Sequence, residues 1–181
     1  MKFIVILASV CALFSGVLCY ACARPSVDYE KLADKITAKT AKKLEQEKGL
    51  ILIGTGGRMM DDIKLMMMGF RYRKIIDINE ARNLLVYCVE EYLTAINNNE
   101  KIRPYLHDYP FTAKNIQIEI FICNPDGSHV APNELNVAAA NEGTAVYEIA
   151  APKRPITITA CKETYEEALE IVASQKKKEQ K

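Results

Sequence analysis

One pair of side chains with catalytic potential lies in the segment His107-Asp108-Tyr109. An acid beside an imidazole can orient the ring and stabilise its protonated form, as general acid–base catalysis requires. His107 and Asp108 are therefore the candidate catalytic residues, and hydrolysis is the reaction class that they suggest. A polar loop latched by Tyr105 and Tyr109 explains the same residues without any chemistry and is the simpler interpretation.

The cysteines and the second histidine are weaker candidates for a catalytic or metal site. Cys88 falls on an apolar stripe, which indicates a buried thiol rather than a nucleophile. Cys123 and His129 flank a turn, but a zinc site takes about four ligands and these are two. No metal or cofactor is predicted, and the chain has no G-x-S-x-G or H-E-x-x-H motif. Cys123 and Cys161 both lie near predicted strand ends and are candidates for a disulfide in an oxidising compartment.

Four basic residues are candidates for binding an anion or a lipid headgroup, namely Arg58, Arg71, Arg73 and Lys74. The last three close a long predicted strand, where they equally suit an exposed face. Arg58 follows Gly54-Thr55-Gly56-Gly57, and glycine-rich loops can cradle a phosphate through backbone N–H groups. A turn that needs positive φ explains these glycines better, because no G-x-G-x-x-G or G-K-[ST] motif accompanies them.

The first 23 residues have the pattern of a secretory signal peptide. Lys2 is the only charge ahead of an apolar run, and Ala21-Cys22-Ala23 supplies the small residues that a signal peptidase reads. We therefore predict a signal peptide over 1–23 and a linker over 24–27, with export to the periplasm, the outer envelope or the medium.

Two other interpretations of this leader also export the chain. In the first, the leader stays uncleaved and residues 3–23 anchor the protein, since the apolar run is just long enough to span a bilayer. In the second, Cys19 or Cys22 carries a lipid.

The net charge of the chain offers no general electrostatic attraction to nucleic acid, because 24 basic and 23 acidic residues leave a net charge of +1. No nucleic acid is predicted as a partner.

The clearest helix is predicted at 77–99. Asp77 and Glu80 fit a capping box. Apolar residues then recur every three or four positions, which is the period of a helix with one buried face. They are Ala81, Leu84, Leu85, Cys88, Val89, Tyr92, Leu93 and Ile96. Two further helices are expected, at 28–48 and 163–174.

Strands are expected wherever apolar residues alternate or form short runs, at 50–53, 63–75, 115–123, 135–140, 144–150 and 156–160. Strands grouped between few helices are typical of an α+β protein. We predict a single α+β domain over 28–176, with a largely antiparallel sheet of five or six strands and helices packed on one face. A charged tail, 177–181, would follow it.

The segment ARNLLVYCVEEYLTAINNNEKIRPYLHDYPFTAKNIQIEIF, residues 81–121, resembles uncharacterised exported proteins of chlamydia-like bacteria. The resemblance implies an exported location and no activity. With no catalytic motif, the favoured function is a non-enzymatic module that binds a protein or peptide partner, with 144–150 as an exposed edge strand that accepts a partner strand. The alternatives are an exported hydrolase using His107 and Asp108, and the anion or lipid-headgroup binder.

Overall fold

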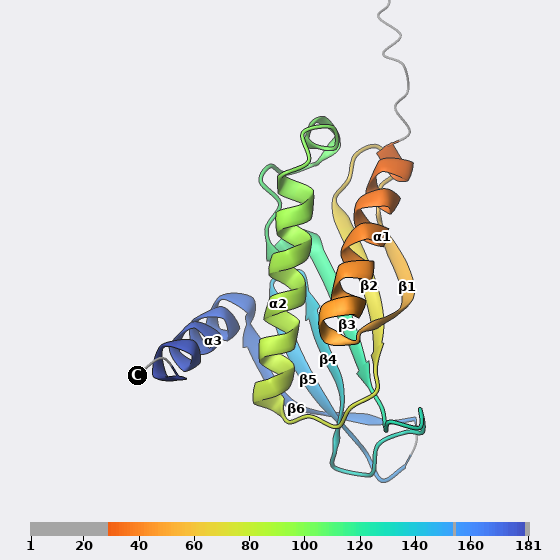
Figure 1. Cartoon of the computed structure of the whole chain (residues 1–181), viewed down its shortest axis with the longest axis vertical. Coiled ribbons are helices and arrows are strands. Elements are labelled where there is room, and N and C mark those ends of the chain that lie inside the picture. Colours follow the sequence, from red (N-terminus) through yellow and green to blue (C-terminus); the bar gives the residue numbers. More distant parts are fainter. Residues whose placement is uncertain (1–28, 154, 180–181) are drawn as a thin grey trace, which may run out of the picture.

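The computed structural model describes residues 29–153 and 155–179, so the predicted leader and linker lie outside the described residues. These described residues form three α-helices and six strands (Figure 1). In chain order they are α1 (Tyr29–Lys48), β1 (Ile51–Arg58), β2 (Leu65–Tyr72), α2 (Ile78–Asn97), β3 (Ile116–Ile122), β4 (Leu135–Asn141), β5 (Thr144–Ala150), β6 (Thr157–Thr164) and α3 (Tyr165–Glu179). Two short 3-10 turns, Arg103–Tyr105 and Ala113–Asn115, follow α2.

The six strands form one sheet in the order β1-β2-β3-β4-β5-β6. Every neighbouring pair is antiparallel except β2 and β3, which run parallel because α2 carries the chain back between them. The α+β class and the largely antiparallel sheet are therefore confirmed. No helix among the described residues is long and apolar enough to cross a membrane.

Helix α2 begins as the sequence predicts. The Asp77 side chain accepts a hydrogen bond from the backbone N–H of Glu80, and the Glu80 side chain accepts one from the backbone N–H of Asp77. Most of the predicted apolar stripe is buried, and Leu85, Cys88, Val89, Tyr92 and Ile96 have no exposed surface. Burial on this scale, at about 1.5–3 kcal/mol for each large side chain, makes α2 the main helical part of the core.

Helices α1 and α2 lie side by side over one face of the sheet (Figure 1). The alternate residues of β3 that point to this face are buried, whereas Gln117, Glu119 and Phe121 point to the opposite face. The buried hydroxyls of Tyr92 and Thr37 join the two helices at 2.6 Å. At the other side of α2, the guanidinium of Arg82 donates two hydrogen bonds to the carboxylate of Glu163 on β6.

Three details differ from the sequence predictions. The glycine segment is no turn: Gly54, Gly56 and Gly57 lie inside β1, and positive φ occurs instead at Gly49, Gly127 and Gly143. The segment 144–150 is no edge strand, because β5 lies between β4 and β6. Helix α3 continues to Glu179, so most of the predicted tail is helical, and residues 180–181 lie outside the described part.

Candidate functional site

His107 has a carboxylate partner, but it is not its neighbour in sequence. Nδ1 of His107 lies 2.6 Å from Oδ2 of Asp62. Asp108 instead accepts a hydrogen bond of 2.9 Å from the side-chain amide of Asn115. The expectation that Asp108 orients His107 is therefore wrong. The hydrogen bond from His107 is the main cause that lowers the pKa of Asp62, and Lys64, 3.7 Å away, adds to it.

Backbone pairing brings these residues together from distant parts of the chain. Ile63 N–H donates to the carbonyl of Tyr105 at 2.8 Å, and His107 N–H donates to the carbonyl of Ile63 at 2.9 Å. The His107 side chain is half exposed. Asp62 is its only hydrogen-bond partner among residues 29–153 and 155–179, so no serine, threonine or cysteine there is held against the ring as an activated nucleophile would be.

The four candidate anion-binding residues do not gather into one site. Arg58 pairs across the β1–β2 hairpin with Leu65, whereas Arg71 pairs with Ile51 at its opposite end, about 20 Å away at the usual rise of a strand. The Arg58 guanidinium is also 2.6 Å from the carboxylate of Glu142. Arg73 and Lys74 follow β2 at the Arg71 end. The four residues therefore do not form one site.

The three described cysteines are free thiols. Cys161 of β6 pairs with Tyr147 of β5, and Tyr147 pairs in turn with Ala138 of β4. Ala138 pairs with Ile120 of β3. Three strand spacings separate Cys161 from the strand that leads into Cys123, or roughly 14 Å, and a disulfide needs Cα atoms within about 7 Å. The predicted Cys123–Cys161 pair is wrong. Burial raises the pKa of Cys88, which agrees with its interpretation as a packing residue.

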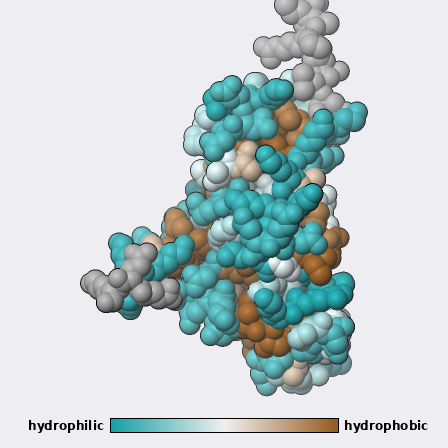
Figure 2. All heavy atoms as spheres, viewed as in Figure 1, coloured by the Kyte–Doolittle hydropathy of each residue, from teal (hydrophilic) through white to brown (hydrophobic). Residues whose placement is uncertain are grey.

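Strand β1 forms one free edge of the sheet, and all eight of its residues are exposed. Ile51, Leu52 and Ile53 are 36%, 37% and 47% exposed. In Figure 2, hydrophobic atoms reach the surface at the right-hand edge, where Figure 1 places β1. Natural edge strands are usually blunted by a charge, a proline or a bulge. β1 has a register shift between Leu52 and Gly54, but no proline and no charge before Arg58.

The glycines of β1 have two different explanations. A Cβ on Gly57 would lie 2.4 Å from the carbonyl oxygen of Leu65, so packing requires glycine there. A Cβ on Gly54 would meet nothing within 4 Å, and one on Gly56 would make only an ordinary contact with Met67. Packing therefore gives no reason for these two glycines. Glycine inside a strand often marks a place where another backbone approaches closely.

A hollow of about 840 Å³ lies between β1 and the first half of α1. Its floor includes Thr55, Gly56 and Gly57 of β1, and its walls come from α1 and the segment after β1. Tyr29 of α1 fixes that segment, since its hydroxyl is 2.9 Å from the carbonyl oxygens of both Met59 and Met60.

The hollow has an excess of negative charge, because both of its basic residues are paired with acids outside its lining. Its lining includes three acids, Glu30, Asp34 and Asp61, and two bases, Arg58 and Lys64. Both bases are engaged, Arg58 with Glu142 and Lys64 with Asp62. Within the described part of the chain, the three acids have no ion-pair partner within 4 Å. The sequence predictions missed this site, and its only local signal was the run of glycines after an apolar strand.

Comparisons with known proteins do not add to this geometry, because no family model, no curated protein and no solved structure matches the chain. Among residues 29–153 and 155–179, no group of three histidine, cysteine or acidic side chains is placed to hold a metal ion.

Proposed function

We propose that this protein is a non-enzymatic, exported binding module that adds an extended peptide of a partner protein to the free edge of β1. The observation that carries the proposal is an exposed, apolar edge strand that borders a hollow. In strand addition, main-chain hydrogen bonds to the edge provide affinity, and side-chain pockets beside the edge provide specificity. β1 offers the first and the hollow beside α1 offers the second.

The other free edge is less suited to this role. β6 also exposes an isoleucine, Ile158, to 47%, but its second half carries Lys162 and Glu163. Glu163 is committed to Arg82, and α3 begins immediately after Thr164. Neither the hollow beside β1 nor the two grooves that border α2 take a residue from β6.

The charges of the hollow indicate which peptides fit. Glu30 and Asp34 lie one helical turn apart on α1, so both carboxylates can face the same side chain of an added strand. A lysine or arginine at that position would gain two acidic neighbours, whereas an acid would be repelled. We therefore expect the bound peptide to be β-prone, with a basic side chain toward α1.

The test is fluorescence anisotropy with a labelled eight-residue peptide that alternates valine and threonine around a central lysine. Ile53→Lys places a charge on the edge strand and should weaken binding at least tenfold, because charged side chains on an edge oppose the addition of another strand. Ile158→Lys is the matched control, since both isoleucines are 47% exposed on opposite edges. Binding should also protect β1 amides from hydrogen exchange. Equal losses in the two variants, or protection confined to β6, would refute the proposal.

A second comparison tests the acidic hollow separately from the edge. The double variant Glu30→Gln/Asp34→Asn should weaken binding of the lysine peptide several-fold, by removing its charged neighbours. The same variant should bind a peptide with glutamine in place of lysine unchanged. If both peptides lose affinity together, the acids support the fold rather than the ligand.

A further inference from the structure

A second surface lies between the two helices, on the side of the molecule that faces away from the sheet. α1 and α2 border an open groove of about 1170 Å³. Its apolar part is contributed by Leu32, Ile36 and Ala95, and Ile36 is 6% exposed. The lining runs along α1 from Leu32 to Gln46, a length of about 21 Å at 1.5 Å per residue.

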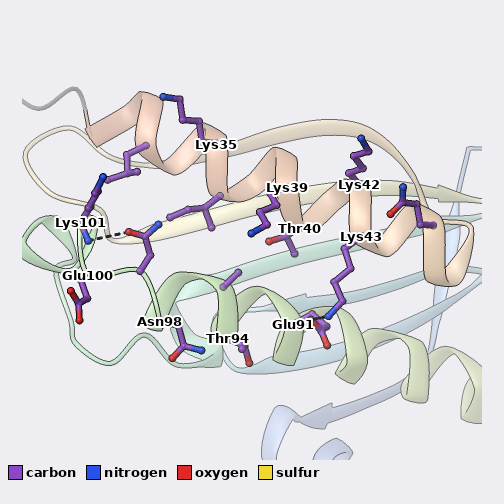
Figure 3. Close-up of a pocket in the computed structure, with 15 residues that line it drawn as sticks. Lys35, Lys39, Thr40, Lys42, Lys43, Glu91, Thr94, Asn98, Glu100 and Lys101 are labelled. Atoms are coloured by element: carbon purple, nitrogen blue, oxygen red, sulfur yellow. Dashed lines mark hydrogen bonds and ion pairs between the residues drawn. The ribbon is translucent and has the colours of Figure 1, made fainter.

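The wall that α1 contributes to this groove is strongly basic, whereas the α2 side contributes Lys101 together with Glu91 and Glu100. Five lysines and two glutamates line it, which leaves three more positive than negative charges. The lysines are Lys35, Lys39, Lys42, Lys43 and Lys101. Figure 3 shows Lys39 and Lys43 pointing from α1 toward α2, whereas Lys35 and Lys42 point away from α2 on the outer side of α1. Only Lys43 has an ion-pair partner among the described residues, at 2.5 Å from Glu91.

This excess charge is local, because the whole chain carries a net charge of only +1. The three surplus positive charges of the groove and the net charge of +1 leave the remainder of the chain at −2, so the basic surface is confined to the groove. An occupant of complementary charge would have to be negative at its flanks and apolar at its centre.

We infer that the groove between α1 and α2 binds an acidic amphipathic helix of a partner protein. A helix of about 14 residues matches the 21 Å of the lining, and its apolar face would pack on Leu32, Ile36 and Ala95. Acidic residues on either side of that face would reach Lys39 on one wall and Lys101 on the other. The added helix would lie on top of α1 and α2, on their side away from the sheet.

Other anionic occupants fit the groove less well. No aromatic side chain lines it, so the bases of a single-stranded nucleic acid would have nothing to stack on. A bilayer surface is flat and would meet only the rim lysines, whereas the apolar strip lies between two helices. A single phosphate is small and would contact only one or two of the lysines, because these are spread over several turns of α1.

The experiment measures binding to a labelled 14-residue helical peptide with leucine at one face and glutamate at its flanks. A second peptide carries glutamine for glutamate. The chain should bind the acidic peptide more tightly, and Lys39→Gln/Lys101→Gln should weaken that binding roughly 5- to 30-fold. Lys177→Gln/Lys178→Gln on α3 is the control, because it removes the same charge from exposed positions outside the groove.

Three outcomes would overturn the inference. The control variant could lose as much affinity as the groove variant, which would indicate an effect of net charge alone. The two peptides could bind equally, which would remove the role of the lysines. Vesicles of anionic phospholipid or a 20-nucleotide thymidine strand could bind more tightly than the acidic peptide, with the same dependence on Lys39 and Lys101. Thermal unfolding by circular dichroism should show all variants folded. The edge of β1 takes no part in this test, so its result is independent of the proposed strand addition.

Discussion

Removing the acceptor of the hydrogen bond between Thr37 and Tyr92 should lower the free energy of unfolding more than removing its donor. Thr37 is 5% exposed and Tyr92 is fully buried. The Thr37 hydroxyl donates to the carbonyl of Ala33 at 2.9 Å, so the Tyr92 hydroxyl is the donor in the 2.6 Å bond between them. Burial raises the pKa of Tyr92, which keeps this donor protonated at any pH of interest.

Removing the acceptor and removing the donor have different costs. Thr37→Val keeps the shape of the side chain but leaves the Tyr92 hydroxyl buried without a partner, at a cost of about 1–3 kcal/mol in the free energy of unfolding. Tyr92→Phe removes the donor and leaves Thr37 bonded to Ala33, so it should cost only about 0.5–1.5 kcal/mol. The double variant should be little worse than Tyr92→Phe alone, because no polar group is then left unpaired.

Urea unfolding followed by circular dichroism gives the four stabilities of this double-mutant cycle. The expected coupling between Thr37 and Tyr92 is about 1–3 kcal/mol, close to the whole cost of Thr37→Val, because the double variant should be little worse than Tyr92→Phe. Residues that do not interact are additive to within about 0.3–0.5 kcal/mol. A coupling inside that range would show that the two hydroxyls do not depend on each other, and that the packing of α1 on α2 is set by apolar contacts alone.

Two ion pairs, Arg82–Glu163 and His107–Asp62, give further predictions. The side chains of Arg82 and Glu163 are 8% and 9% exposed. Arg82→Met should therefore destabilise the protein by about 3–5 kcal/mol in urea unfolding. Arg82→Met/Glu163→Leu should recover most of this loss, because no buried charge remains. A double variant that is no more stable than the single variant would contradict this prediction. His107→Ala should raise the pKa of Asp62 toward its ordinary value in a carbon-13 NMR titration, and Asp108→Asn should leave it unchanged. Because folding lowers the pKa of Asp62, its stabilising effect is present above the unfolded-state pKa and disappears as the pH falls through the folded-state pKa.

Elements with a local physical cause were predictable. The capping box of Asp77 and Glu80 begins α2 because two side chains three residues apart satisfy each other's backbone N–H groups. The alternation of isoleucines from Ile116 to Ile122 predicts β3 because a strand exposes successive side chains to opposite faces. Gly127 adopts positive φ in the turn that Cys123 and His129 flank, because glycine takes the left-handed conformation without steric cost.

Features that depend on strand order were not predictable. Alternation shows that a segment is a strand, but it does not say which strands lie on either side. The sequence therefore suggested β5 as an edge, whereas β6 returns to cover it and leaves β1 free. The glycines of β1 suggest a turn in the sequence, because glycine occurs both in turns and in exposed strands, and the residue type alone does not distinguish the two.

The candidate sites divide in the same way. The sequence alone suggested Asp108, wrongly, as the partner of His107, and it places many lysines in the 28–48 segment. Only the tertiary structure decided that the acid is Asp62, 45 residues away along the chain, and that the lysines of α1 border a groove with α2. Local sequence fixes secondary structure through backbone hydrogen bonding and periodic burial. Pairings between distant segments are set by how the whole set of strands and helices packs around one core, and no short stretch of sequence carries that information.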